Sequence, residues 1–288
     1  MVDSPARPAW SQQFTPDAIR ELAASGPLAD VTPEWAWGGS TGRGVRVAVV
    51  DGGIEHDHPA LGESVRGGVV VEYDEQAENF VRIEPDDPPG DLSGHGTACA
   101  GIIHAIATDA EIYSVRVLGS DMKGRAIQFA AGIDWAVDNG MHVANLSLST
   151  SNQDYYGLFH QLADAAYFKN VALVSAVNNL PEPSYPSLYS SVISVAAHEG
   201  RDPFLFYYNP APPVEFGAPG IDVQVAWKDK QYLVCTGNSF AAPHIAGIVA
   251  LIRAKHPELT PFQMKTVLWA CAANTRRAES LPRGRPSR

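Results

Sequence analysis

Apolar residues occur along this chain in blocks whose lengths alternate between those of strands and those of helices. Short β-branched runs such as 45–50 leave no polar face, which indicates buried, parallel strands. Strands and helices alternating at these lengths predict right-handed βαβ units, and hence an α/β fold with a mostly parallel central sheet and helices on both faces. The expected strands are 45–50, 69–73, 111–118, 141–148, 171–177 and 192–197, and the expected helices are 124–139, 155–169, 239–255 and 261–273.

The composition is that of an ordinary globular chain, with 45% hydrophobic residues among 288. Its formal net charge of -11, from 21 Lys and Arg against 32 Asp and Glu, argues against nucleic acid or an anionic membrane as a partner. The exception is 275–288, which is rich in arginine and has no apolar periodicity. We expect this basic tail to be disordered.

The chain shows no sequence signal for secretion or for membrane insertion. Residues 1–26 contain no continuous apolar run of the kind found in a signal peptide, and the apolar run 245–252 is too short to span a bilayer. The cysteines, Cys99, Cys235 and Cys271, are odd in number and widely spaced, which favours thiols in a reducing compartment over a disulfide framework. The expectation is therefore a cytoplasmic protein.

Polar side chains directly follow two of the predicted strands. Asp51 comes after the strand 45–50 and is followed by two glycines, and Asn178 comes after the strand 171–177. Open α/β sheets bind their ligands at the carboxyl ends of the strands. Both residues are therefore candidates for a functional site, although an Asp-Gly turn is also a common structural feature. The nearby cluster 55–58 offers metal-ligand side chains, but without a distant third ligand a solvated bend is the better interpretation.

His95 lies between Gly94 and Gly96 at the start of a predicted helix of small and apolar residues. Helices seldom accept glycines without a packing reason, so this pattern predicts a close approach of backbone at the histidine. Cys99 lies one helical turn later, on the same face. We interpret it as a small buried apolar residue rather than a second nucleophile.

Ser239 lies among small residues where an extended segment turns into the helix 239–255. A serine there meets the positive end of the helix and its unpaired N–H groups, which suits a nucleophile. Taken alone, however, the segment is better explained by a helix N-cap. A catalytic serine needs a base and an orienting acid. The only acids after Ser239 are Glu258 and Glu279, and no histidine follows either one. The serine, acid, histidine order of α/β-hydrolases is therefore excluded, and the partners must lie upstream.

The three candidates occur in the order Asp, His, Ser, and their surroundings resemble the subtilisin family of serine endopeptidases. The resemblance rests on V-V-D-G-G-I at 49–54, S-G-H-G-T at 93–97 and G-N-S-F-A-A-P-H at 237–244, and it extends over 28–274. It implies a catalytic domain at 28–274, with an N-terminal extension at 1–27 and the tail at 275–288. It also implies the following roles: Ser239 as nucleophile, His95 as general base and acid, Asp51 as the group that orients His95, Asn178 as oxyanion donor, and Lys123, Gly124, Arg125, Ser147, Leu148, Ser149, Ala176 and Val177 as the substrate-binding segments.

The chain departs from the family pattern at the expected pocket for the P1 residue of the substrate. Val177 and Ser149 stand where the family usually has glycine, and both add bulk. The family's large pro-domain and the calcium loop after the catalytic histidine are also not recognisable in this sequence. We therefore expect no cofactor and no metal, calcium included.

Three functional classes remain open at this point. The first is a peptide-bond hydrolase that acts through an acyl-enzyme. The second is a specialised protease or transpeptidase that processes one precursor peptide in natural-product maturation. The third is an inactive peptide-binding module, for which we would expect a triad residue to be lost, and none is lost. The expected partner in all three is a peptide or protein, and the sequence leaves the oligomeric state open.

Overall fold

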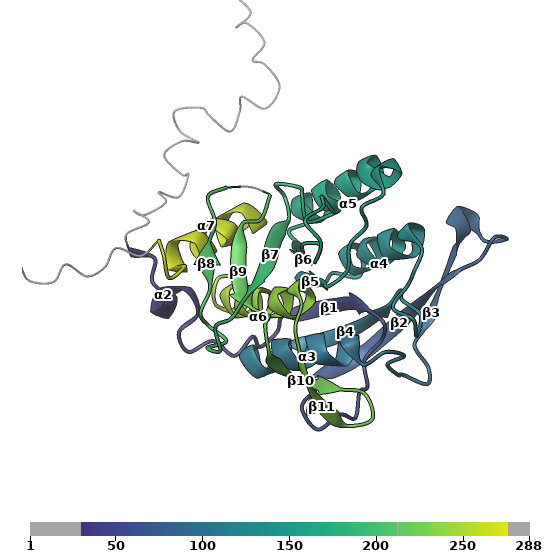
Figure 1. The fold of residues 1–288 in the computed structure, drawn as a ribbon, viewed down its shortest axis with the longest axis horizontal. Coiled ribbons are helices and arrows are strands. Elements are labelled where there is room, and N and C mark those ends of the chain that lie inside the picture. Colours follow the sequence, from purple (N-terminus) through teal and green to yellow (C-terminus); the bar gives the residue numbers. More distant parts are fainter. Residues whose placement is uncertain (1–29, 212, 276–288) are drawn as a thin grey trace, which may run out of the picture.

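The computed structural model describes residues 30–211 and 213–275. They form a twisted sheet of nine strands in the order β3-β2-β4-β1-β5-β6-β7-β9-β8, beside a two-stranded sheet formed by β10 and β11 (Figure 1). Strands β3 and β8 are antiparallel to their neighbours and lie at the two edges, and the pairings between them are parallel. The strands are β1 (Arg46–Asp51), β2 (Val65–Tyr73), β3 (Val81–Pro85), β4 (Glu111–Arg116), β5 (Val143–Leu146), β6 (Ala172–Ala176), β7 (Ile193–His198), β8 (Tyr207–Tyr208), β9 (Phe216–Pro219), β10 (Val223–Trp227) and β11 (Gln231–Cys235).

Helices cover both faces of the large sheet. Alternate residues of β1 show this directly, because Val47 and Val49 join one hydrophobic core and Ala48 and Val50 join the other. The first core includes α3 (His95–Ile106), α6 (Asn238–Lys255) and α7 (Pro261–Cys271), and the second includes α4 (Ala126–Asp138) and α5 (Tyr156–Phe168). A short helix, α2 (Pro33–Trp37), packs on α6. The predicted α/β fold with helices on both faces is confirmed.

The predicted strands and helices are present, and the sequence pattern mainly misjudged their ends and the edge strands. Strand β2 begins four residues earlier than predicted, at Val65, because Gly67 and Gly68 obscured the apolar pattern. Gly68 packs closely on β4, where a Cβ would lie 2.6 Å from the Ser114 carbonyl oxygen. Strand β3 lies in a segment for which no strand was predicted; its side chains are largely exposed, so it carries no apolar signature.

The last points concern the two ends of the chain and the length of its helices. The extension 1–27 and most of the tail 275–288 lie outside the described residues. Among the residues that are described, no helix combines the length and the apolar character that crossing a membrane requires.

Candidate active site

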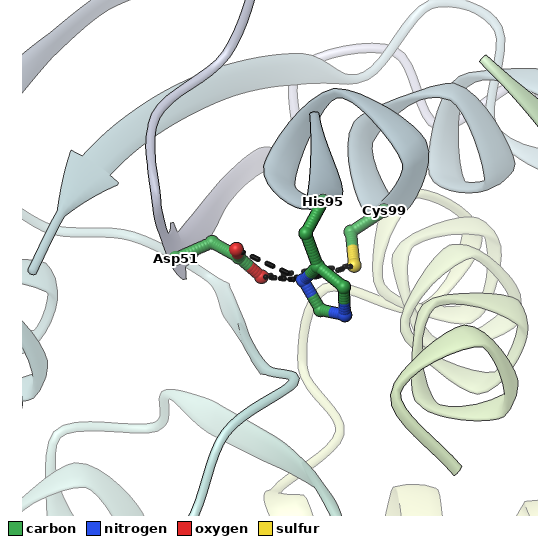
Figure 2. A group of neighbouring side chains, drawn as sticks. All are labelled: Asp51, His95 and Cys99. Atoms are coloured by element: carbon green, nitrogen blue, oxygen red, sulfur yellow. Dashed lines mark hydrogen bonds and ion pairs between the residues drawn. The ribbon is translucent and has the colours of Figure 1, made fainter. Parts of the chain in front are cut away.

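Asp51 and His95 form a buried pair at the carboxyl end of β1. Asp51 is the last residue of this strand, and His95 is the first residue of α3. The His95 Nδ1 atom lies 2.9 Å from both carboxylate oxygens of Asp51 (Figure 2). Burial acts to lower the pKa of His95, but the charge of Asp51 and the hydrogen bonds of His95 hold this pKa well above 6.5. Because the carboxylate accepts a hydrogen from Nδ1, the Nε2 atom of the neutral ring is left free to act as a base.

Glycines bring the two residues together, as their pattern predicted. A Cβ on Gly96 would lie 2.0 Å from the Gly53 carbonyl oxygen, so the first turn of α3 rests directly on the turn that follows Asp51. Gly94 has a φ of 95°, and a Cβ there would lie 2.5 Å from the ring of Trp227. Larger side chains at either position would push His95 away from Asp51.

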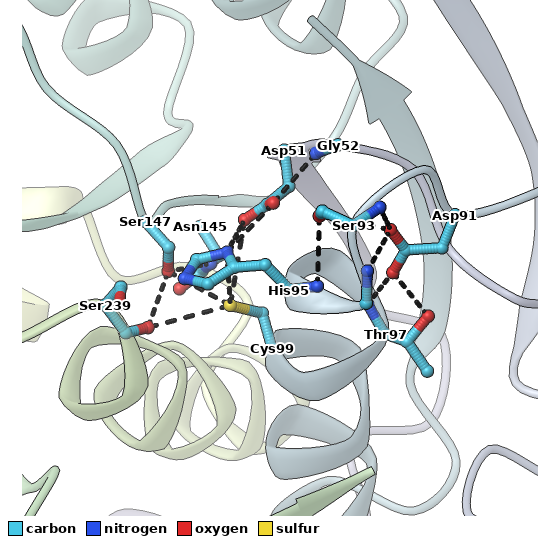
Figure 3. Close-up of polar contacts among 11 residues, drawn as sticks. Asp51, Gly52, Asp91, Ser93, His95, Thr97, Cys99, Asn145, Ser147 and Ser239 are labelled. Atoms are coloured by element: carbon cyan, nitrogen blue, oxygen red, sulfur yellow. Dashed lines mark hydrogen bonds and ion pairs between the residues drawn. The ribbon is translucent and has the colours of Figure 1, made fainter. Parts of the chain in front are cut away.

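Asp91 caps the helix that carries His95, a role that the sequence analysis missed. One carboxylate oxygen accepts hydrogens from the backbone N–H groups of Ser93 (2.9 Å) and Gly94 (2.7 Å), and the other accepts from the N–H (2.8 Å) and the hydroxyl (2.6 Å) of Thr97 (Figure 3). A carboxylate at this end of a helix also interacts favourably with the helix dipole. An acid four residues before His95, preceded by a glycine and followed two residues later by a serine, was the available signal for this cap.

Ser239 lies in the first turn of α6, at the turn-to-helix junction that the sequence predicted. Its carbonyl oxygen accepts hydrogen bonds from the Ser147 hydroxyl (2.8 Å) and from the Cys99 thiol (3.6 Å), which fix its backbone (Figure 3). His95 and Ser239 line the same cleft. Among the described residues no hydrogen bond joins the Ser239 hydroxyl to His95. Such bonds are often long in a free enzyme and tighten when substrate binds.

The cleft has a volume of about 260 Å³ and is lined by most of the predicted site residues. It is lined by His95, Leu118, Met122, Ser147, Leu148, Ser149, Ala176, Val177, Asn178, Asn179 and Ser239. Leu118, Met122 and Asn179 were not among the predicted residues. Lys123, Gly124 and Arg125 do not line this cleft, and the Arg125 guanidinium lies 3.9 Å from the centre of the Tyr73 ring. Their proposed contact with an extended substrate therefore stays a prediction.

The Asn178 carboxamide is oriented by its own loop. Its Oδ1 atom accepts a hydrogen bond from the Leu180 N–H (3.0 Å), and its backbone N–H donates to the Ser184 hydroxyl (3.2 Å). The Nδ2 group has no acceptor among the described residues, and Asn178 lines the cleft beside Ser239. This amide is therefore available as a donor to a negatively charged oxygen in the cleft.

Asn238 joins the loop of Asn178 to the helix of Ser239. Its Nδ2 atom donates to the carbonyl oxygens of Val177 (3.2 Å) and Asn178 (3.0 Å), and its Oδ1 atom accepts from the Ala197 N–H (2.9 Å). Its own N–H donates to Oδ1 of Asn179 (2.9 Å). One side chain thus connects the segment after β6, strand β7 and the start of α6.

Cys99 packs against the pair of Asp51 and His95. Its sulfur lies 3.8 Å from the Asp51 Oδ2 atom, 4.0 Å from the His95 Nδ1 atom and 3.3 Å from the Ser147 hydroxyl oxygen (Figure 3). Burial raises the pKa of this thiol, which keeps it protonated and makes it a poor nucleophile. The structure therefore agrees with the expectation that Cys99 is a small buried residue. It also shows that Cys99 contacts three residues of the site.

Asp51, His95 and Cys99 are also the one group of potential metal ligands found among the described residues, with ligand atoms within 4.8 Å of one another. These atoms already face one another as hydrogen-bond partners, so a metal would have to displace those bonds. The cluster 55–58 is dispersed: Asp57 pairs with Lys230 (2.6 Å), and the His58 ring bonds to the Gln231 carbonyl oxygen (3.1 Å). The expected absence of a metal stays a prediction.

Comparison with known proteins gives a consistent result. The sequence profile described as "Subtilase family" matches residues 42–284. The chain is 35% identical over 241 residues to Subtilisin BL from Lederbergia lenta, covering 80% of this chain and 84% of that protein. It is also 35% identical over 241 residues to M-protease from Shouchella clausii, of which it spans 59%. Among solved structures, a cold adapted subtilisin-like serine proteinase superimposes with a TM-score of 0.65 at 26% identity, covering 83% of this chain and 87% of that one.

Proposed function

The chain belongs to the subtilase family and is a serine endopeptidase, and from this premise we propose that Asp51, His95 and Ser239 are its catalytic triad. The observation that supports this most strongly is the buried Asp51–His95 pair, with both carboxylate oxygens 2.9 Å from Nδ1. His95 lines the same cleft as Ser239. All three residues come from separate elements, β1, α3 and α6, and meet at one end of the sheet. Burial of a titratable pair in a cleft is characteristic of a catalytic site.

The proposed reaction begins when the Ser239 Oγ atom attacks the carbonyl carbon of the peptide bond. His95 takes the hydroxyl proton on Nε2, and the Asp51 carboxylate stabilises the resulting imidazolium through Nδ1. The negative charge that develops on the carbonyl oxygen is then stabilised by the Asn178 amide and by the backbone N–H of Ser239. That N–H lies in the first turn of α6, where the backbone donors have no partner within the helix.

The tetrahedral intermediate collapses when His95 returns its proton to the amine leaving group. The C–N bond breaks, and the acyl group remains on Ser239 as an ester. A water molecule then attacks the ester, with His95 again accepting the proton, and the free serine is restored. His95 thus moves a proton from the serine to the leaving amine in the first half of the reaction, and a proton from water to the serine in the second half.

We propose that Asn238 is a positioning residue for this chemistry. It contacts the two carbonyl groups that flank the start of the Asn178 loop and does not line the cleft. Because the oxyanion donors come from two segments, Asn178 on one and Ser239 on the other, their separation depends on the bonds that join these segments. A donor that is displaced by about 1 Å loses much of its effect on the transition state.

The substrate is a peptide or protein, and we propose that the enzyme favours small P1 side chains. Val177 and Ser149 both line the cleft, so the bulk that they add in place of glycine reduces the space for a side chain. We retain the cytoplasm as the proposed compartment, because Cys99 and Cys235 are free thiols.

Cleavage of a random peptide library tests the proposed function directly. Sequencing of the products should show internal peptide bonds cut, with small residues at P1, and Ser239→Ala protein prepared in parallel should give no products. Library cleavage that persists in the Ser239→Ala protein would contradict the proposed nucleophile.

A further inference from the structure

A cavity of about 470 Å³ lies at the end of the sheet opposite to the active-site cleft. The strands approach it by their amino ends: Arg46 is the first residue of β1, His142 directly precedes β5, and Val171 directly precedes β6. Asp51 and Asn178, by contrast, lie at the carboxyl ends of β1 and β6. The cavity is therefore separate from the site described above.

Basic side chains dominate the lining of this cavity. Arg43, Arg46, His142, Lys169 and Arg253 contribute to it, and no Asp or Glu does. The chain as a whole carries a formal net charge of -11, so a region without acids runs against its composition. A cavity lined by one sign of charge attracts ions of the opposite sign.

The acids around the cavity lie outside its lining. Asp109 pairs with Arg43 (3.2 Å), and Asp138 pairs with Lys169 (2.6 Å). Glu258 lies 3.8 Å from the ring of His256, and its side chain is 69% exposed. Glu111 is opposite Arg46 in the pairing of β1 with β4 and acts on the His142 ring through its charge, but it does not line the cavity either. The two ion pairs neutralise Arg43 and Lys169, so the unpaired charges of the lining are those of Arg46 and Arg253.

Arg253 is the strongest indication of a missing anion. This residue is only 4% exposed. Its terminal nitrogens donate to carbonyl oxygens of Pro257, Leu259 and Asn170, and to Oδ1 of Asn170, all of them neutral groups. Its Nε atom is buried without a hydrogen-bond partner among the described residues. A buried charge with only neutral partners is costly, and a bound anion would offset that cost.

Arg46 and His142 offer further donors to the same space. Among the described residues the Arg46 guanidinium forms neither a hydrogen bond nor an ion pair, and it lies over Gly140, where a Cβ would be 2.8 Å from its NH2 atom. The His142 Nδ1 atom accepts a hydrogen bond from the Arg46 backbone N–H (2.9 Å). The neutral ring must then carry its hydrogen on Nε2, which leaves a second donor at the cavity.

We propose that this cavity is a binding site for a phosphate group, held by the guanidinium of Arg46 and the Nε2–H of His142 over the buried charge of Arg253. Guanidinium groups bind the oxygens of phosphate with charge-assisted hydrogen bonds, and a lining that contains cationic donors and no carboxylate matches that chemistry. The site is independent of the peptidase reaction, so it can fail without affecting the proposed triad.

Thermal unfolding with inorganic phosphate tests the proposal on the full chain, using Ser239→Ala protein to prevent self-digestion. At ten times its dissociation constant, phosphate should raise Tm by about 3 °C over chloride at equal ionic strength. The rise should saturate with concentration, whereas general salting-out by phosphate does not. Titration calorimetry on the same protein should give one phosphate per chain.

Two variants make the test specific. Arg46→Gln should weaken phosphate binding by about tenfold or more, because it removes a charge-assisted contact, and it should leave peptide cleavage unchanged in the enzyme with Ser239 intact. Arg82→Gln is the matched control, since Arg82 lies on β3 among Glu72, Asp74 and Glu84, far from the cavity, and should bind phosphate normally. An unsaturable rise in Tm, or equal affinity in the Arg46→Gln protein, would overturn the proposal.

Discussion

Replacing Asn238 by alanine should slow catalysis more than the loss of stability can explain. The change removes three hydrogen bonds of the side chain, two to the carbonyl groups of Val177 and Asn178 and one from the Ala197 N–H. At a net value of about 1 kcal/mol each, these bonds contribute about 3 kcal/mol to stability. Tm should then fall by roughly 6–12 °C, and the enzyme stays folded at 25 °C if its stability lies within the usual range of about 5–15 kcal/mol.

The catalytic effect follows from the geometry of the donors. Removal of an oxyanion donor costs about 10²–10³-fold in kcat, a value that comes from a subtilisin and sets the upper limit here. The Asn238→Ala variant keeps Asn178 but no longer fixes its loop, so we expect kcat to fall by about 10- to 100-fold. KM should change little, because a misdirected donor affects the transition state more than the bound substrate.

The assay measures kcat and KM on one chromogenic peptide for Asn238→Ala, Asn178→Ala and the double variant. If Asn238 acts through Asn178, the double variant should be within about threefold of Asn178→Ala alone. The matched control is Asn274→Ala, which removes two hydrogen bonds between a carboxamide and the backbone of Tyr208 (2.9 and 2.7 Å) outside the cleft. It should lower Tm and leave kcat unchanged. A normal kcat in Asn238→Ala, or losses that multiply with Asn178→Ala, would refute the positioning role.

The value of kcat/KM should rise with pH through the pKa of His95, with its midpoint well above 6.5, because only the neutral ring accepts the serine proton; a midpoint below 6.5 would contradict the Asp51–His95 pairing. The same raised pKa stabilises the fold below pH 6.5, and this contribution is lost as the pH rises through the pKa of folded His95. Val177→Gly should broaden the P1 preference toward larger side chains in library cleavage, and a wild-type profile already dominated by Phe, Tyr or Leu would be evidence against the narrow pocket. Thermal unfolding should be unaffected by EGTA or millimolar calcium, and a clear fall in Tm on chelation would reveal a calcium site.

The apolar pattern predicted the interior of the fold well, because buried parallel strands must be apolar on both faces. Strand β1, with five of its six residues buried, is such a case. Strand β11 is different: its side chains are exposed except for partly buried Cys235, so burial imposes no pattern on it. The sequence indicated only an extended segment before Ser239, and the pairing of this segment with β10 depends on contacts that no local pattern records.

Within the site, the close backbone approach at His95 was predictable from its own neighbours, whereas roles that depend only on hydrogen bonds to distant segments were not. The glycines beside His95 indicated a close backbone approach, which the structure shows between Gly96 and Gly53. The role of Asn238 could not be predicted, because its partners lie 41 to 61 residues away in the chain. Neither could the cavity around Arg253, whose partner Asn170 is 83 residues distant.

The central claim is that Asp51 and His95 activate Ser239, and labelling with a fluorophosphonate tests it most directly. The reagent phosphonylates an activated serine, and mass spectrometry of the digested protein identifies the modified residue. We predict a single label on Ser239, its complete loss in Ser239→Ala, and severely slowed labelling in His95→Ala protein that is still folded at the assay temperature. A label on another residue, or labelling of Ser239 at the normal rate without His95, would contradict the claim.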